Sequence, residues 1–288
     1  MLMKHLLICP SERPAVSLLA REQPLAAIPL LGQSLLEYWL SSLAASGVKE
    51  VIVLAHDRPK QVQDAVGNGS RWGINLELIE ESRELSPAQA LLKYASELDG
   101  NQVAITVLDR FPGEPEVDLW SSYRDLFGAL LKWMPKSRTP DRVGVKEISP
   151  GVWVGSHSVV SPKVTLLGPC WIGNHVHLSG GSVIGPNAIV EDGSFLEAQL
   201  EISNSCIGPN TFLGKYARVM GSFAYGSTLL DWHSEVVTEV PDPFLMCALR
   251  HQGQGRAARW FARASELYSR NKEEAGMLWK QLLLNKEG

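Results

Sequence analysis

Three apolar stretches of the N-terminal half are each followed by polar residues that could bind a phosphate, a sugar or a metal ion. Ser11 and Arg13 follow the first stretch, Glu81 the second and Asp109 the third. Ligands of parallel α/β sheets bind beyond the carboxyl ends of the strands, so these side chains would meet at one edge. An arginine can hold a phosphate through two hydrogen bonds, and an aspartate can ligate Mg²⁺. The pattern predicts a nucleotide-binding edge.

The loop after the first stretch, CPSERPAV, lacks the residue type on which phosphate-binding loops depend. Glycine allows backbone N–H groups to close around a phosphate, but the first glycine of the chain is Gly32. Pro10 and Pro14 have no N–H to donate. The loop therefore has the position of a phosphate-binding loop without its usual donors.

Two histidines of the second half could support a different chemistry. His175 and His177 flank the apolar Val176, and strand alternation would turn both imidazoles outward. An outward imidazole can act as a general base. A solvated surface histidine without a catalytic role is the simpler interpretation of either residue taken alone.

The elements that would position the first set of residues alternate between strands and helices. The start SPAQ of one helix has Ser86 as N-cap, Pro87 at the first position and Gln89 to complete a capping box. Such alternation predicts a mostly parallel, doubly covered sheet with right-handed crossovers. The predicted strands are 4–9, 48–55, 74–80 and 102–108, and the predicted helices are 34–47, 58–66, 86–98 and 119–134.

The second half carries a repeat of a different kind. From Val154 to Val219 an aliphatic residue recurs every six positions, with one slip between Ile202 and Ile207. Such short segments cannot bury their apolar side chains alone, but stacked turns bury a continuous column. The repeat predicts a β-solenoid of about four turns. Glycines such as Gly155 and Gly173 would lie at its tight corners. The segment 256–284 reads as amphipathic helix.

Composition narrows the class of protein further. The net charge of −4 excludes the basic footprint of a nucleic-acid-binding protein. The cysteines are too far apart for metal-ligand spacing, so we expect small core residues, and free thiols fit a reducing cytoplasm. No apolar run approaches the length of a membrane span. We expect a cytoplasmic protein with neither nucleic-acid nor membrane partners.

The segment IPLLGQSLLEYWLSSLAASGVKEVIVLAH (28–56) resembles the sugar-1-phosphate nucleotidylyltransferases, which join a nucleoside triphosphate to a sugar phosphate and release pyrophosphate. The resemblance covers residues 1 to about 110. It implies that Ser11, Arg13, Gln23 and Glu81 bind the nucleotide and that Asp109 binds Mg²⁺. The repeat separately resembles the hexapeptide-repeat family, which implies a left-handed parallel β-helix and homo-oligomers, most often trimers.

This chain departs from the nucleotidylyltransferase pattern at the positions that carry out the reaction. The family's glycine-rich loop ends in Thr-Arg-Leu and is followed by Lys-Pro, whereas this chain has CPSERPAVSLL and Gln23-Pro24. Nucleotidyl transfer depends on positioning and charge stabilisation of phosphate, and Gln23 cannot neutralise charge as lysine would. Residues 110–151 are also too few to hold the family's sugar pocket. We therefore expect a truncated, catalytically degenerate protein that binds a nucleotide or nucleotide sugar.

Two alternatives stay open. Many hexapeptide-repeat proteins are acyltransferases, so His175 or His177 could serve as the base toward acetyl-CoA. The chain could instead be a non-catalytic assembly or regulatory subunit. If it is an enzyme, it is a transferase. The expected organisation is a nucleotidyltransferase-like Rossmann-type α/β domain, a linker, the β-helix and a C-terminal helical tail, over residues 1–134, 135–150, 151–245 and 246–288.

Overall fold

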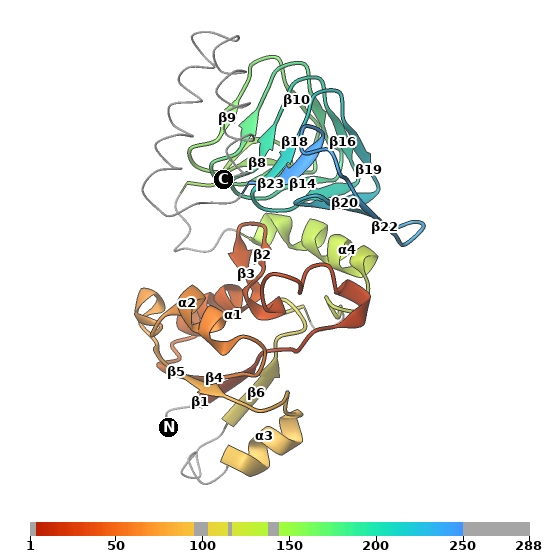
Figure 1. Ribbon diagram of the computed structural model, residues 1–288. Helices are drawn as coiled ribbons and strands as arrows, with labels where there is room; N and C mark the ends of the chain where they lie inside the picture. Colours follow the sequence, from red (N-terminus) through yellow and green to blue (C-terminus); the bar gives the residue numbers. More distant parts are fainter. Residues whose placement is uncertain (1–3, 95–102, 115–116, 138–143, 250–288) are drawn as a thin grey trace, which may run out of the picture.

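The computed structural model describes residues 4–94, 103–114, 117–137 and 144–249 (Figure 1). Its N-terminal half is an α/β unit, and its second half consists almost wholly of short strands. The helix predicted over 256–284 lies outside the described residues. Among the described residues, no helix has both the length and the apolar character needed to cross a membrane.

The N-terminal half contains the predicted parallel sheet. Its strand order is β5–β4–β1–β6, and every pair of neighbours is parallel. All four predicted strands are confirmed, with boundaries within two residues of those expected. Their bounds are β1 Lys4–Ile8, β4 Glu50–Ala55, β5 Asn75–Glu80 and β6 Val103–Val107.

Two helices begin at capping boxes, whereas the helix predicted over 119–134 begins at Tyr123. Ser34 caps the first helix in a reciprocal capping box with Glu37. Ser86 accepts from the Gln89 N–H at 3.3 Å, and Gln89 accepts from the Ser86 N–H at 3.1 Å, as predicted. The helices are α1 Leu35–Ala45, α2 Pro59–Val66, α3 Pro87–Tyr94 and α4 Tyr123–Trp133. The short 3₁₀ turns are η1 Pro14–Val16, η2 Leu25–Ala27, η3 Ser70–Trp72 and η4 Met134–Lys136.

A small hairpin precedes α1. Strands β2 Pro29–Leu30 and β3 Gln33–Ser34 pair in antiparallel fashion. The two residues between them, Leu31 and Gly32, both have positive φ, at 56° and 74°. This is the backbone of a tight two-residue turn, and it directs two successive N–H groups to one side.

In the second half, the chain visits three sheets in rotation. The first sheet, in the order β22–β21–β20–β17–β14–β11–β8–β7, comprises Val236–Glu239, Thr228–Asp231, Ser222–Tyr225, Ser205–Ile207, Ala188–Val190, Cys170–Ile172, Val152–Val154 and Lys146–Ser149. The second, β23–β18–β15–β12–β9, comprises Met246–Ala248, Thr211–Leu213, Phe195–Leu196, His177–Leu178 and Val159–Val160. The third, β10–β13–β16–β19, comprises Thr165–Leu166, Val183–Ile184, Glu201–Ser203 and Arg218–Met220.

From β8 to β17 each strand pairs in parallel with the strand of the same sheet one turn later. Cys170 pairs with Ala188, whereas Ala188 pairs with Ser205, so the turn that contains the predicted slip is one residue shorter. The aliphatic side chains spaced six apart face a common core, in which Ile172 and Leu178 are buried. We call the stretch from β8 to β19 the coil. β7, which falls within the expected linker, pairs antiparallel with β8.

The glycines expected at tight corners of the coil differ in their backbone: Gly185 has a positive φ of 103°, as a tight corner requires. Gly155 and Gly173 do not have the positive φ expected of tight corners, which instead falls on His157 and His175. A Cβ on Gly155 would lie 2.6 Å from the backbone carbon of Gly173. These glycines are therefore needed because successive turns approach closely there.

The two halves share one apolar core. Along the first sheet, Trp153, Trp171, Ile189, Cys206 and Phe223 stand in register on its outward side and are buried against the N-terminal half. We call these residues the outward ladder. In Figure 1, α4 lies between this sheet and the rest of the α/β unit. The α4 side chain of Phe127 stacks on Trp232 with ring centroids 4.4 Å apart.

The cysteines behave as small core residues, as predicted. All four are buried. Burial is the main reason that the pKa of Cys9 rises to about 12 and that of Cys170 to about 12. A thiol with so high a pKa is inert at neutral pH, so neither residue is a candidate nucleophile.

Candidate functional site

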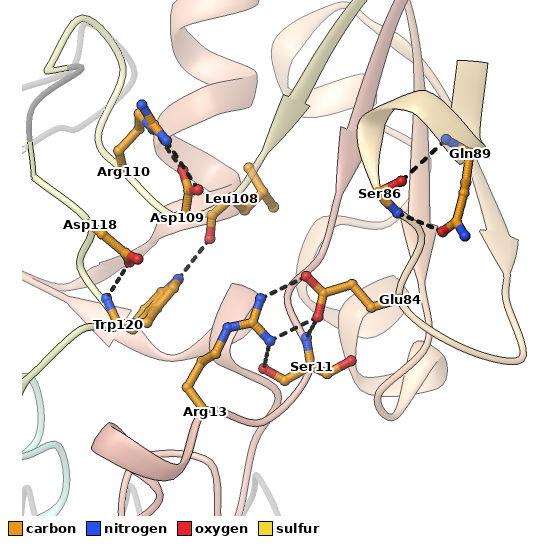
Figure 2. A network of polar contacts seen from close by, with 10 residues as sticks. All are labelled: Ser11, Arg13, Glu84, Ser86, Gln89, Leu108, Asp109, Arg110, Asp118 and Trp120. Atoms are coloured by element: carbon orange, nitrogen blue, oxygen red, sulfur yellow. Dashed lines mark hydrogen bonds and ion pairs between the residues drawn. The ribbon is translucent and has the colours of Figure 1, made fainter. Parts of the chain in front are cut away.

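The loop at the carboxyl end of β1 is occupied by a carboxylate of the chain itself (Figure 2). Glu84, which follows β5, accepts a hydrogen bond from the Ser11 backbone N–H at 2.9 Å. The Arg13 guanidinium donates to both oxygens of the same carboxylate, at 2.6 and 2.8 Å. Ser11 and Arg13 thus meet at this edge as predicted, and the acidic group between them is Glu84.

The hydrogen bonds of this contact favour the charged forms of Glu84 and Arg13. Burial alone would raise the pKa of Glu84, but the hydrogen bonds from Arg13 and Ser11 outweigh it and hold that pKa below its usual value. The hydrogen bond to Glu84 is also the main cause of the raised pKa of Arg13. Both side chains are partly exposed, at 31% for Arg13 and 24% for Glu84. The pair is therefore in contact with solvent.

Asp109 stands at the end of β6, at the same edge of the sheet (Figure 2). Its two carboxylate oxygens accept from the Arg110 guanidinium at 2.7 and 3.1 Å. Among the described residues, no three His, Cys, Asp or Glu side chains gather into a potential metal site. Asp109 would have to leave Arg110 before it could ligate Mg²⁺, so the residues as they stand do not fit this ion.

Glu81 turns away from the loop and contacts helix α3. The Lys93 ammonium lies 2.7 Å from both of its oxygens, and the Tyr94 hydroxyl also donates to it. Burial acts to raise the pKa of Glu81, and these donors outweigh it and lower that pKa. The visible role of this buried carboxylate is to fix α3 against the sheet.

Three of the arginines described at this edge are already paired with an acidic group. Arg13 is paired with Glu84 and Arg110 with Asp109, while Arg58 donates to both oxygens of Asp57 at 2.7 Å. Triphosphate binding needs positive charge that is not already neutralised. The charge of these three arginines becomes available only if their pairs open. Arg83, which is exposed in the stretch after β5, makes no ion pair with a described residue.

Gln23 lies elsewhere. It lines a cleft of about 670 Å³ between the two halves, together with Arg21 and Glu22 of the N-terminal half and Tyr225 and Glu239 of the second half. We call this the inter-half cleft. None of Ser11, Arg13, Glu84 and Asp109 lines it, so the structure does not bring Gln23 together with the other predicted nucleotide-binding residues.

The two histidines point outward but have different surroundings. Val176 between them is buried, in agreement with the predicted alternation. His175 is exposed and stacks on His157, with ring centroids 5.0 Å apart. His177 stacks on Phe195 at 4.5 Å, and burial lowers its pKa to about 4. A base with so low a pKa accepts a proton weakly at neutral pH.

Sequence reasoning missed a buried carboxylate between the halves. Glu191 is 2% exposed and accepts from the backbone N–H groups of Leu31 and Gly32 at 2.5 and 2.7 Å. The hairpin tip thus offers two adjacent donors to one acid of the coil. The signal in the sequence was a pair of acidic residues, Glu191 and Asp192, directly after the inward Val190.

Comparison with known proteins covers part of the chain. Residues 18–110 match the family model described as "Nucleotidyl transferase". A glucose-1-phosphate thymidylyltransferase of Streptomyces antibioticus is 30% identical over 34% of this chain and 28% of its own length. One of an Actinoplanes species is 30% identical over 28% of this chain and 27% of its own length. The low-salt glycan biosynthesis nucleotidyltransferase Agl11 of Haloferax volcanii is 26% identical over 43% of this chain and 35% of its own length.

The chain thus spans about a third or less of the length of these curated relatives. The family match begins at Leu18, after the loop that carries Ser11 and Arg13, and ends at Arg110. Over residues 18–110 this chain is related to the sugar-1-phosphate nucleotidyltransferase family, which confirms the resemblance inferred from the segment 28–56.

Proposed function

We propose that this chain binds a nucleotide or a nucleotide sugar at the carboxyl edge of its N-terminal sheet and does not catalyse nucleotidyl transfer. The observation that carries the proposal is Glu84, whose carboxylate takes the Ser11 N–H and the Arg13 guanidinium. These are the two kinds of donor that a phosphate would use. A phosphate group can bind there by displacing Glu84.

The absence of catalysis is proposed from the charges at the same edge. Transfer requires donors and cations placed on the leaving pyrophosphate. In this chain Arg13, Arg58 and Arg110 are neutralised by neighbouring carboxylates. The place of the family's lysine is taken by Gln23, which lines a different cleft.

The experiment is a titration of the full chain with thymidine triphosphate, chosen because two relatives are thymidylyltransferases. We expect Glu84→Gln to bind the triphosphate about tenfold more tightly than the wild type, because the variant removes a competing negative charge. Glu80→Gln, at an exposed position at the end of β5, is the matched control and should leave the affinity unchanged.

Two results would contradict the proposal. Equal affinity of the wild type and Glu84→Gln would show that Glu84 does not compete with the phosphate. Release of pyrophosphate from thymidine triphosphate and glucose 1-phosphate, abolished by Asp109→Asn, would show that the edge is catalytic. Pyrophosphate release is measured on a purified sample with and without Mg²⁺.

We also propose that the coil is a left-handed β-helix of the hexapeptide type and mediates homo-oligomerisation, with a trimer as the expected state, in a cytoplasmic protein. Support for the β-helix comes from the chain's passage through three sheets in turn, with strands one turn apart paired in parallel. Support for the oligomer comes from exposed apolar side chains on the coil, including Val159 and Met220. Sedimentation of the full chain measures the state directly. A monomer at all concentrations would refute the oligomer.

The acyltransferase alternative stays a prediction. The exposed His175 is its better candidate base, since the low pKa of His177 makes that imidazole a weak proton acceptor. A thermal shift with acetyl-CoA that is abolished by His175→Ala would favour it. If the wild type shows no shift at saturating acetyl-CoA, the alternative is excluded.

A further inference from the structure

The side of the second sheet that faces away from the core of the coil carries a row of largely aromatic residues. They stand in register on adjacent strands and are His177, Phe195, Phe212 and Cys247. The rings of His177 and Phe195 stack with centroids 4.5 Å apart, and those of Phe195 and Phe212 with centroids 6.0 Å apart. We call these four residues the second-sheet ladder.

The phenylalanines of this ladder are buried although they point outward. Phe195 is 6% exposed and Phe212 is 7% exposed, which is within the range of the outward ladder that the N-terminal half covers. The third sheet gives the opposite reference. Its outward Val183 is 37% exposed, and Glu201 and Arg218, which continue the same row, are exposed as well. The second-sheet ladder therefore has the exposure of a covered surface.

Stacking within the ladder does not account for this burial, because stacked rings cover each other's faces and leave their outer edges pointing away from the sheet. The burial also changes along the sheet. Val159, in register with His177 at one end, is 49% exposed, whereas Cys247 at the other end is buried. Among the described residues, the partly buried Leu249 packs against this buried end. The cover therefore begins where the described part of the chain ends.

The sequence that follows Leu249 has a pattern that suits this surface. Its spacing puts four apolar or aromatic side chains on one side of a helix, namely Trp260, Ala264, Leu267 and Tyr268. We call these four residues the C-terminal stripe. Eight residues of helix, from the first to the last of them, rise about 12 Å. The second-sheet ladder spans three strand spacings, or about 14 Å, so the two rows match in length.

The connection favours this segment over a second copy of the chain. Leu249 is fixed on the sheet because its N–H donates to the Asn210 carbonyl at 2.6 Å. About ten residues, 250–259, join it to the C-terminal stripe and can span up to about 33 Å when extended. A short tether of this kind holds its segment at an effective concentration on the order of millimolar.

We propose that residues 256–270 dock as an amphipathic helix on the second-sheet ladder of the same chain, with the C-terminal stripe against Phe195, Phe212 and Cys247. The helix crosses the strands and follows the axis of the coil. It covers the second sheet as the N-terminal half covers the first. The docking does not depend on the function proposed for the nucleotide edge.

Reaction of the Cys247 thiol with a maleimide tests this proposal on the full chain. The thiol is part of the ladder, so its rate of reaction reports how often the cover is removed. The other three cysteines are buried elsewhere and serve as internal references. Mass spectrometry of peptides identifies which thiol has reacted. We expect Leu267→Glu to accelerate the reaction of Cys247 at least about tenfold, because a carboxylate cannot be buried against apolar side chains without a large cost.

Two further variants make the comparison specific. Ser269→Glu is the matched control, since it introduces the same charge on the opposite side of the same predicted helix. It should leave the reaction of Cys247 at the wild-type rate. Ala264→Glu, within the C-terminal stripe, should repeat the effect of Leu267→Glu. Unchanged slow reaction of Cys170, which lies inside the coil, shows that the coil remains folded in these variants.

The proposal is overturned if Cys247 reacts at the same rate in the wild type and in both stripe variants. It is also overturned if Ser269→Glu accelerates the reaction as much as Leu267→Glu does. Acceleration of Cys170 equal to that of Cys247 in both stripe variants would indicate general unfolding instead of lost docking. A rate for Cys247 in the wild type that rises on dilution would show that a second copy provides the cover.

Discussion

Two glutamates of this molecule accept hydrogen bonds from backbone amides far away in the sequence, but in different surroundings. Glu84 binds the Ser11 amide at the edge of the N-terminal sheet, where its side chain is 24% exposed. Glu191 binds the Leu31 and Gly32 amides between the halves, where it is 2% exposed. A carboxylate that accepts from backbone amides can be an exchangeable stand-in for a ligand or a permanent part of the structure.

Burial decides between these roles. A buried amide without an acceptor costs its full desolvation free energy, whereas an exposed one finds water. Glu191 therefore joins the halves, whereas Glu84 closes a loop that a phosphate would open under the proposed function. The variants below test this distinction, from the largest expected effect to the smallest.

Replacing Glu191 should have the largest effect on stability. Glu191→Ala leaves two amides of the hairpin tip without their acceptor, and we expect a loss of about 3 kcal/mol of unfolding free energy. The melting temperature should fall by roughly 5–10 °C, measured by calorimetry. The matched control is Glu201→Ala, an exposed glutamate paired with Arg218, which should cost under about 0.5 kcal/mol. Equal effects of the two variants would contradict the role assigned to Glu191.

Mild acid should weaken the coil while the edge contact stays charged. The pKa of His177 is lowered to about 4 in the folded protein, so protonation favours the unfolded chain. Its neutral form gives full stability above pH 6.5, and about 3 kcal/mol is lost as the pH falls from 6.5 toward 4. Glu84 stays charged over most of this window, because its hydrogen bonds outweigh burial and hold its pKa below the usual value. Unfolding titrations at several pH values should show a flatter dependence in His177→Phe.

Removal of Glu84 should cost much less than removal of Glu191. Arg13 and Glu84 are a partly exposed pair, so Glu84→Ala should lower the unfolding free energy by about 1 kcal/mol. Hydrogen exchange gives the sharper readout. The Ser11 amide should exchange faster in this variant, while the Leu31 and Gly32 amides keep their wild-type protection. A loss of protection at all three would show that the two contacts are not independent.

Asp109 should show the smallest effect. Its partner Arg110 is an adjacent residue with a side chain 41% exposed, so Asp109→Asn should change the unfolding free energy by under about 0.5 kcal/mol. A melting curve checks this value. A loss comparable to that of Glu191→Ala would mean that Asp109 has a structural role that its visible contacts do not explain.

Most elements of the fold could be predicted because they follow from local patterns. The 3.6-residue period of α1, the capping box at Ser86 and the six-residue spacing of the coil depend on neighbours in the sequence. The inward side chains of the coil were predicted from spacing alone, and Ile172 and Leu178 are indeed buried.

The site was predicted only in part, because its contacts depend on distant segments. Three glutamates lie within five positions at and after the end of β5, namely Glu80, Glu81 and Glu84. Their spacing does not indicate which of them contacts Ser11. Glu81 was chosen, but it binds Lys93 and Tyr94, whereas Glu84 reaches the loop. The outward ladder was overlooked because the outward positions of the repeat were considered only for histidines.

The outward ladder limits how several copies of this chain can assemble. If the α/β unit were removed, the first sheet would expose a large apolar surface that includes Trp153, Trp171 and Phe223. In the intact chain this surface is already covered by the N-terminal half. Any ring of subunits must therefore be joined through residues elsewhere, and a fragment that begins at β8 should aggregate where the full chain does not.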